Sequence, residues 1–186
     1  MKILGIVGSP RKGGNTEILV EEALTATREA GAQTEVILLA DKNIAGCDGC
    51  SSCFETGACK IKDDMQSIYQ ADAIIFGSPV YFGGVTAQAK ALIDRTYVFL
   101  RDRRLKGKVV APIVALRRVG GRQARTLLYD YFIGQGMIVT RGAIGYGRQK
   151  GEVREGVGGT QGLSALEEAR NAGKEVVQML QRLSRA

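Results

Sequence analysis

Short apolar runs alternate with helically spaced segments along most of this chain. The apolar runs predict five strands, at residues 2–8, 34–40, 73–77, 108–116 and 137–145. Helical spacing predicts helices at residues 16–30, 63–69, 85–100, 122–132 and 164–185, with Asp63 as the N-cap of the second. The segment 151–162 contains five glycines and predicts a flexible loop. Strands that alternate with helices in this way indicate a parallel sheet with right-handed crossovers.

The strand count favours one particular α/β fold. Five strands suit a flavodoxin-like, doubly wound parallel sheet in the order 2-1-3-4-5, with helices on both faces. Ligands of such sheets bind at the carboxyl ends of the strands, near the switch between strands 1 and 3. No linker or internal repeat interrupts the pattern, so we expect residues 1–186 to form a single domain, with a cysteine-rich loop at residues 46–62 after strand 2.

Composition narrows the class of protein. The chain has 186 residues, 45% of them hydrophobic, and no apolar run reaches the length of a membrane span. The N-terminal apolar stretch is short and resembles a buried strand more than a secretory signal, so we expect a cytoplasmic protein with no membrane partner. The chain has no histidine. This excludes a Ser-His-Asp triad and histidine-based acid–base catalysis, and we predict no catalytic side chain.

Basic residues are concentrated in one part of the chain. The net charge is +7, and residues 101–150 hold twelve Lys and Arg against only Asp102 and Asp130. Such a region binds nucleic acid, a phosphorylated cofactor or an acidic protein, or it is simply a solvated face. No nucleic-acid motif accompanies the charge, so we expect no nucleic-acid partner.

The loop after the first strand has the composition of a phosphate site. Its sequence, GSPRKGGNT at residues 8–16, is neither a Walker loop nor GxGxxG. Backbone N–H groups at a strand-to-helix turn suit a phosphate, and Ser9, Asn15 and Thr16 add side-chain donors. Either Arg11 or Lys12 offsets the phosphate charge. The alternative is a plain capped turn with Asn15 as the N-cap.

The loop after the third strand lies on the other side of the same expected crevice. Pro79, Val80, Tyr81, Phe82 and Gly83 form a stiff, aromatic and largely apolar surface. Its free backbone N–H groups suit the polar edge of a planar ring. Alternatively, its aromatics belong to the core or to an interface.

The loop after the fourth strand gives a weaker signal. Ala115 ends the strand, and Gly120 and Gly121 allow a close approach between backbone and ligand. A plain loop explains the same residues equally well.

All four cysteines fall within thirteen residues. Cys47, Cys50, Cys53 and Cys59 have the spacing C-x2-C-x2-C-x5-C. The first three repeat the gaps of the bacterial ferredoxin motif, which binds a cubane iron–sulfur cluster. A four-cysteine zinc site, two disulfides, or free redox-active thiols remain as alternatives.

Three segments together resemble a known family. GSPRKGGNT (8–16), SPVYFGGVTAQAKALIDRT (78–96) and CDGCSSCFETGACKIKDDM (47–65) are similar to the NADPH-dependent FMN reductase superfamily, and in particular to its iron–sulfur flavoproteins. The resemblance implies FMN on the two strand-end loops and a [4Fe-4S] cluster held by the four cysteines. It also implies a homodimer or homotetramer in which the cluster loop lies near a neighbouring subunit's flavin. Arg117, Arg118 and Arg122 depart from the family's more glycine-rich third loop, which often ends in an acidic residue.

Three functional hypotheses follow. The first is a redox flavoprotein that passes electrons between a [4Fe-4S] cluster and FMN, with a ferredoxin-like donor and a small-molecule or protein acceptor. The second is an NAD(P)H-dependent FMN or quinone reductase in which the cysteines hold no working cluster. The third is a flavin-binding regulatory module.

Overall fold

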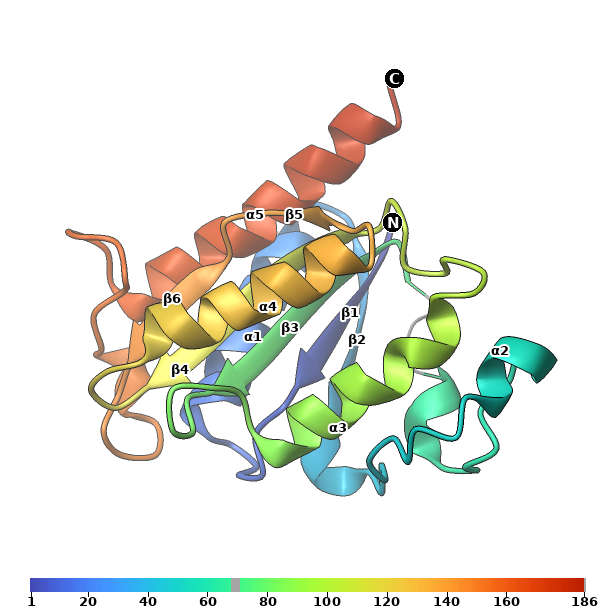
Figure 1. The fold of residues 1–186 in the computed structure, drawn as a ribbon. Coiled ribbons are helices and arrows are strands. Elements are labelled where there is room, and N and C mark those ends of the chain that lie inside the picture. The colour runs from blue at the N-terminus through green and yellow to red at the C-terminus, as the bar shows by residue number, and fades with distance from the viewer. Residues whose placement is uncertain (68–70, 186) are drawn as a thin grey trace.

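A parallel sheet runs through the centre of the molecule (Figure 1). The computed structural model describes residues 1–67 and 71–185, and only the backbone of residues 66 and 67. The strands are β1 (Lys2–Val7), β2 (Gln33–Leu38), β3 (Ala73–Pro79), β4 (Val109–Leu116), β5 (Ile138–Val139) and β6 (Ala143–Tyr146). They pair in the order β2-β1-β3-β4-β5, and β6 also pairs with β4. Each pairing is parallel. The predicted flavodoxin-like fold and strand order are confirmed.

The predicted fifth strand is broken in two. Its pairing with β4 shifts by one residue between β5 and β6. Pro112, opposite the break, has no N–H for the ladder. The shift leaves one extra residue on the β5–β6 side, and Gly142 lies in this interval with φ +67°. A Cβ at Gly142 would lie 2.0 Å from the Pro112 carbonyl oxygen. The break is therefore a β-bulge imposed by a proline inside a central strand.

Helices cover both faces of the sheet, as predicted (Figure 1). One face carries α1 (Asn15–Glu29) and α5 (Ala165–Leu183), and the other carries α3 (Ala87–Arg95) and α4 (Gly121–Gly134). Arg170 of α5 pairs with Glu22 and Glu29 of α1 and ties the first pair of helices together. None of the helices within the described residues is both long and apolar enough to cross a membrane.

Several predicted elements have different bounds. The helix expected at 85–100 begins after its N-cap Thr86 and becomes a 3-10 turn at Thr96–Phe99. The helix expected at 63–69 is a 3-10 turn at Asp64–Ser67, and Tyr69 lies outside the described residues. The strand expected at 34–40 ends at Leu38 and is followed by a 3-10 turn. The cysteine-rich loop predicted at residues 46–62 contains the short helix α2 (Ser52–Thr56).

The segment at residues 151–162 has more regular hydrogen bonding than a flexible loop. It contains a 3-10 turn at Glu152–Arg154 and buries Val153 completely. The Tyr146 amide donates to the Val157 carbonyl at 3.0 Å, and the Gly159 amide donates to the Ile144 carbonyl at 2.8 Å. The segment therefore pairs with β6, because the sheet edge offers it partners that the sequence pattern does not reveal.

Candidate functional site

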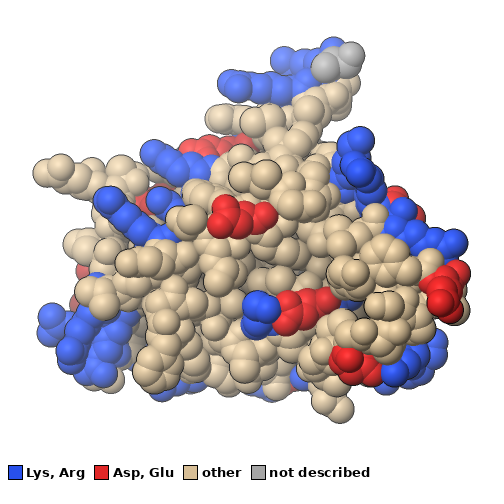
Figure 2. All heavy atoms as spheres, in the orientation of Figure 1, with Lys and Arg blue, Asp and Glu red and all other residues tan. Residues whose placement is uncertain are grey.

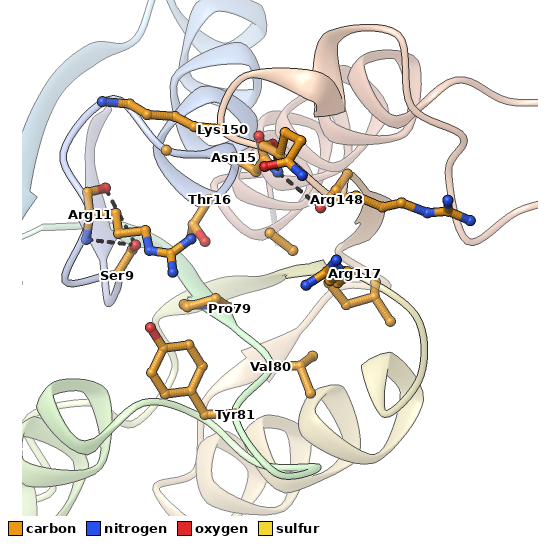
Figure 3. Close-up of a pocket in the computed structure, with 15 residues that line it drawn as sticks. Ser9, Arg11, Asn15, Thr16, Pro79, Val80, Tyr81, Arg117, Arg148 and Lys150 are labelled. Carbon is orange, nitrogen blue, oxygen red and sulfur yellow. Dashed lines mark hydrogen bonds between the residues drawn. The ribbon is translucent and has the colours of Figure 1, made fainter.

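A cleft of about 200 Å³ lies at the carboxyl ends of the central strands (Figure 3). It is formed by residues from the loops after β1, β3, β4 and β6. Eight of the predicted binding residues line it, namely Ser9, Arg11, Asn15, Thr16, Pro79, Val80, Tyr81 and Ala115. Small-molecule sites typically measure about 300–1,000 Å³, so a large nucleotide would extend beyond this cleft over the neighbouring loops.

The loop after β1 (residues 8–16, the phosphate loop) is held in place by hydrogen bonds within the loop and from the start of α3. Ser9 Oγ accepts from the Arg11 amide at 3.1 Å, and Thr86 Oγ1 donates to the Gly8 carbonyl at 2.5 Å. Ser9 and Thr16 are almost fully buried at the base of the cleft. The first backbone N–H groups of α1 have no partner within the helix itself, which suits an anion.

The two cations of the phosphate loop have different positions. Arg11 lines the cleft, and Figure 3 shows its guanidinium turned toward Thr16. Lys12 instead forms an ion pair with Asp41. The sequence left the choice between them open, and the geometry assigns the cleft to Arg11.

The sequence suggested Asn15 as a phosphate donor or as a helix N-cap, and the structure gives it a different role. Its Nδ2 donates to the carbonyls of Gly147 (3.1 Å) and Gln149 (2.9 Å), and its Oδ1 accepts from the Gly151 amide at 2.8 Å. The N-cap position belongs to Gly14, which makes no side-chain cap. Asn15 therefore holds the loop after β6 against the phosphate loop and closes one side of the cleft.

The loop after β3 (residues 79–84, the aromatic loop) ends in a tight turn. Tyr81 and Gly84 exchange two backbone hydrogen bonds of 3.0 Å each. Phe82 and Gly83 between them both have positive φ, +49° and +81°. Phe82 is fully exposed, so it is not a core aromatic. Among the described residues the amides of Phe82 and Gly83 have no hydrogen-bond partner, which leaves both free for a ligand.

The loop after β4 packs against the aromatic loop. Gly120 has φ +91°, and a Cβ there would lie 2.9 Å from Val80 Cγ1. Gly120 and Gly121, together with Arg118, Arg122 and Tyr146, line a second and more open cleft of about 780 Å³. Gly120 therefore allows two loops to meet, rather than contacting the first cleft itself.

The sequence missed the contribution of the loop after β6. Gly147, Arg148, Gln149 and Lys150 line the cleft, as does Arg117 after β4. Figure 3 shows Arg117 directed into the cleft and Arg148 extending away from it, whereas Lys150 reaches across to the phosphate loop, where its Nζ lies 3.4 Å from the position of a Cβ built on Gly13. Their position in the sequence could have predicted this role, since they follow a predicted strand at the sheet edge where ligands bind.

The four cysteines are gathered on one loop but differ in exposure. Cys53 is buried against the core, Cys59 is half-buried, and Cys47 and Cys50 are exposed. Burial raises the pKa of the Cys53 thiol, and the nearby charges of Cys59, Cys50 and Cys47 raise it further. Within the described residues no group of three or more Cys, Asp or Glu side chains is arranged to hold a metal ion. Thiolate is the ligand type that iron–sulfur clusters take, and all four thiols belong to this one loop.

A buried ion pair fixes the base of this loop. The Arg95 and Asp63 side chains are 0% and 7% exposed, and Arg95 Nη1 lies 2.5 Å from Asp63 Oδ2. Arg95 also donates to the carbonyls of Ala45 and Ile61, which flank the four cysteines. Asp63 also accepts from the Ala45 amide at 3.1 Å. Neither side of this ion pair was among the predicted site residues.

The basic residues of 101–150 do not form a single site. Arg101 and Arg104 donate to carbonyls of the cysteine loop, whereas Arg117, Arg148 and Lys150 line the first cleft. Figure 2 shows how these charges are distributed on one face of the molecule. Lys and Arg side chains gather over the loops at lower left, and basic and acidic side chains mix near α2.

The chain is similar to known proteins in both sequence and fold. The profile of the NADPH-dependent FMN reductase family matches residues 1–150. An iron–sulfur flavoprotein of Methanocaldococcus jannaschii is 41% identical over 97% of both chains. An iron–sulfur flavoprotein of Methanosarcina thermophila is 40% identical over 75% of this chain and 76% of its own. The structure of a flavodoxin from the domain Archaea superposes with a TM-score of 0.64 at 17% identity, covering 97% of this chain and 99% of that one.

Proposed function

Because the chain belongs to the NADPH-dependent FMN reductase family, and within it to the iron–sulfur flavoproteins, we propose that it is a redox flavoprotein that transfers electrons between a [4Fe-4S] cluster and FMN. The observation that carries the proposal is the coexistence of two separate sites, a phosphate-type cleft and a four-thiol loop. We propose residues 1–186 as one cytoplasmic domain with a cluster-binding loop at 46–62.

The first cleft supports FMN binding through its distribution of polar and apolar groups. Ser9, Thr16 and Arg11 would hold the phosphate at the start of α1. The aromatic loop and the loop after β4, including Tyr81 and Ala115, would support the ring. FMN accepts one or two electrons, and so connects one-electron with two-electron partners.

The chain's own residues provide what such a site needs. The free amides of the aromatic loop offer donors toward the edge of a planar ring, and Val80 and Pro79 exclude water from beneath it. Arg11 and Arg117 bring positive charge to the cleft, which favours an anionic ligand.

The cysteine loop and the flavin cleft are far apart within one subunit. In Figure 1, the loop between β3 and α3 joins one end of α3, and α2 lies beyond the other end. We propose that the working unit is a homodimer or homotetramer, in which the cysteine loop of one subunit approaches the flavin of another. A ferredoxin-like protein would supply electrons to the exposed side of the cysteine loop, and a small-molecule or protein acceptor would remove them at the flavin.

Cofactor content tests the proposal directly. Protein purified without oxygen should contain FMN together with about four iron and four sulfide per chain, and should give the EPR signal of a reduced cubane cluster. The variant Cys50→Ala should lose the iron and keep the FMN, since the phosphate loop is separate. Flavin without iron in the wild type, or loss of both cofactors in the variant, would contradict the two-site assignment.

The second cleft favours one alternative function. Arg118 and Arg122 beside it would suit the phosphates of NAD(P)H, as in an NAD(P)H-dependent FMN or quinone reductase. Rapid anaerobic bleaching of the flavin band on mixing with NADPH would favour this reductase over a pure electron carrier. A slow or absent response to NADPH, with fast reduction by ferredoxin, would favour the carrier.

A further inference from the structure

Large apolar side chains are exposed where α2 meets the 3-10 turn after α3. Phe54 of α2 and Tyr97 of that turn are each 43% exposed, and Leu100, just after the turn, is 38% exposed. The rings of Phe54 and Tyr97 pack against each other, with their centroids 4.8 Å apart. Single exposed apolar side chains are ordinary in proteins, whereas a contiguous group of them is typical of an interaction surface.

Arginine side chains adjoin these apolar groups. Arg101 Nη1 donates to the Glu55 carbonyl at 3.0 Å, and Arg104 Nη2 donates to the Gly57 carbonyl at 3.4 Å, so both lie at the C-terminal end of α2. Arg103 between them is exposed, and its side chain has no ion-pair partner among the described residues. Aromatic residues and arginine are enriched in protein–protein interfaces and supply much of their binding energy. We call this surface the docking face, and it consists of Phe54, Tyr97, Leu100, Arg101, Arg103 and Arg104.

The charge of the docking face selects the kind of partner that fits it. Residues 97–108 carry five basic side chains and one acidic side chain, and α2 adds only Glu55. Two copies of this face would repel each other, because like charges would then lie opposite one another. An acidic protein surface would instead meet complementary charge, which speeds association and favours one orientation.

We propose that the docking face binds an acidic electron-transfer protein. The inference rests on the proposed function for the redox role of this partner, and it adds the surface that the partner contacts. Phe54 directly follows the buried Cys53 within α2. A protein bound to the docking face therefore lies next to the cysteine loop.

The aromatic and basic groups contribute to this binding in different ways. Apolar contact with Phe54 and Tyr97 would slow dissociation, whereas charges at the rim would mainly change the association rate and its dependence on salt. Arg101 and Arg104 are already held by backbone carbonyls, so they lose less side-chain freedom when a partner binds. Electron-transfer complexes are typically small and short-lived, and a face of a few residues suits them.

Reversing the charge at matched positions tests the docking face. The probe is an acidic bacterial-type ferredoxin in its oxidised state, titrated into the purified holoprotein at low salt and followed by calorimetry. Arg103→Glu should weaken binding by about tenfold or more, because like charges then face each other. The control is Lys174→Glu, which makes the same change of charge at an exposed position of α5, on the other side of the sheet (Figure 1). This variant should bind ferredoxin as the wild type does, and binding by the wild type should weaken as salt is added.

A second measurement uses only the wild type. Hydrogen exchange of the complex with oxidised ferredoxin should show protection at residues 52–57 and 97–104. Protection at the flavin cleft instead, equal weakening by the two variants, or no binding of ferredoxin would overturn the inference. So would an Arg103→Glu variant that changes the sedimentation of the protein and not its affinity for ferredoxin, since the face would then lie between copies of this chain.

Failure of the proposed function would be recognised separately. Binding of oxidised ferredoxin requires no electron transfer, so each result above leaves the cofactor assignment intact. Wild-type protein that binds ferredoxin at the docking face but contains no iron or sulfide would contradict the proposed function and support the docking face.

Discussion

Individual charged residues in this molecule have roles that depend on their burial. Arg11 and Lys12 are neighbours in sequence, yet one lines the cleft and the other pairs with Asp41. Arg95 and Asp63 form an almost solvent-free pair, whereas Arg104 and Asp102 form a half-exposed one. The strength of an electrostatic contribution depends on this difference, because solvent screens exposed pairs.

Arg11 and Lys12 give a matched test of the phosphate loop. Removing a hydrogen bond to a charged group costs about 1.5–3 kcal/mol, so Arg11→Gln should weaken FMN binding roughly 10- to 100-fold. Lys12→Gln should bind FMN as the wild type does. Fluorescence quenching of FMN on titration with apoprotein measures both. Equal weakening by the two substitutions would indicate a general charge effect instead of a directed contact.

Asp63 should make stability depend on pH. Burial opposes its ionisation, but hydrogen bonds from Arg95 and from the Met65 and Ala45 amides hold the pKa of Asp63 below its usual value. Its stabilisation is therefore present above about pH 4, the usual pKa of an aspartate, and is lost as the pH falls through the lowered value.

Replacement of Asp63 tests that dependence. Asp63→Asn leaves the Arg95 charge buried without its counterion, so the free energy of unfolding at pH 7 should fall by about 3–5 kcal/mol. The difference from the wild type should shrink as the pH drops below about 4. Urea unfolding followed by circular dichroism measures this, with the half-exposed Asp102→Asn as a control expected to change little. A difference that is independent of pH would contradict the assigned ion pair.

At the scale of elements, short backbone interruptions shape the sheet edge. The bulge at Gly142 displaces β6 relative to β5, and the segment after β6 then pairs back onto it. This arrangement brings residues 147–150 to the cleft, where Asn15 holds them. Register and turn geometry thus add a fourth loop to the site.

Two glycine-to-alanine substitutions distinguish a required glycine from a tolerated one. Gly142→Ala should destabilise the protein, because left-handed backbone costs about 1–2 kcal/mol and overlap with the Pro112 carbonyl costs about 1–3 kcal/mol more. Gly134, at the end of α4, has open space around its Cβ position. Gly134→Ala should therefore be neutral or stabilising by up to about 1 kcal/mol. Chemical denaturation compares them, and similar effects at the two positions would argue against the bulge as described.

At the scale of the molecule, α3 separates the two proposed redox sites. The aromatic loop leads into the N-terminal end of this helix, and Arg95 at its C-terminal end contacts the residues that flank the cysteines (Figure 1). Under the proposed function, assembly with a second subunit would bring a cysteine loop to a flavin.

Mixed assembly tests this arrangement. Cys50→Ala subunits that carry FMN, mixed with Arg11→Gln subunits that carry the cluster and from which the weakly bound FMN has been removed, should form oligomers in which reduced ferredoxin bleaches the flavin. Neither variant alone should do so at a comparable rate. Stopped-flow absorbance at the flavin band measures the rates, and sedimentation confirms that subunits have exchanged. Exchange without recovered flavin reduction would contradict transfer between subunits.

The sequence predicted the sheet, its strand order and the helices on both faces, because hydrophobic periodicity follows directly from which side chains are buried. It also identified eight of the residues that line the cleft, because glycine-rich and aromatic loops at strand ends have recognisable composition. The spacing of the four cysteines was by itself enough to indicate a candidate cluster motif. These features are local in sequence, so local patterns were sufficient.

Only the tertiary structure decided how distant residues meet. Arg95 lies 32 positions from Asp63, and Asn15 lies 132 from Gly147. The sequence contains no periodic signal for such pairs, because which charges become buried depends on how complete helices and loops pack. The choice of Arg11 over Lys12, the bulge at Gly142 and the buried Arg95–Asp63 pair all arise from that packing.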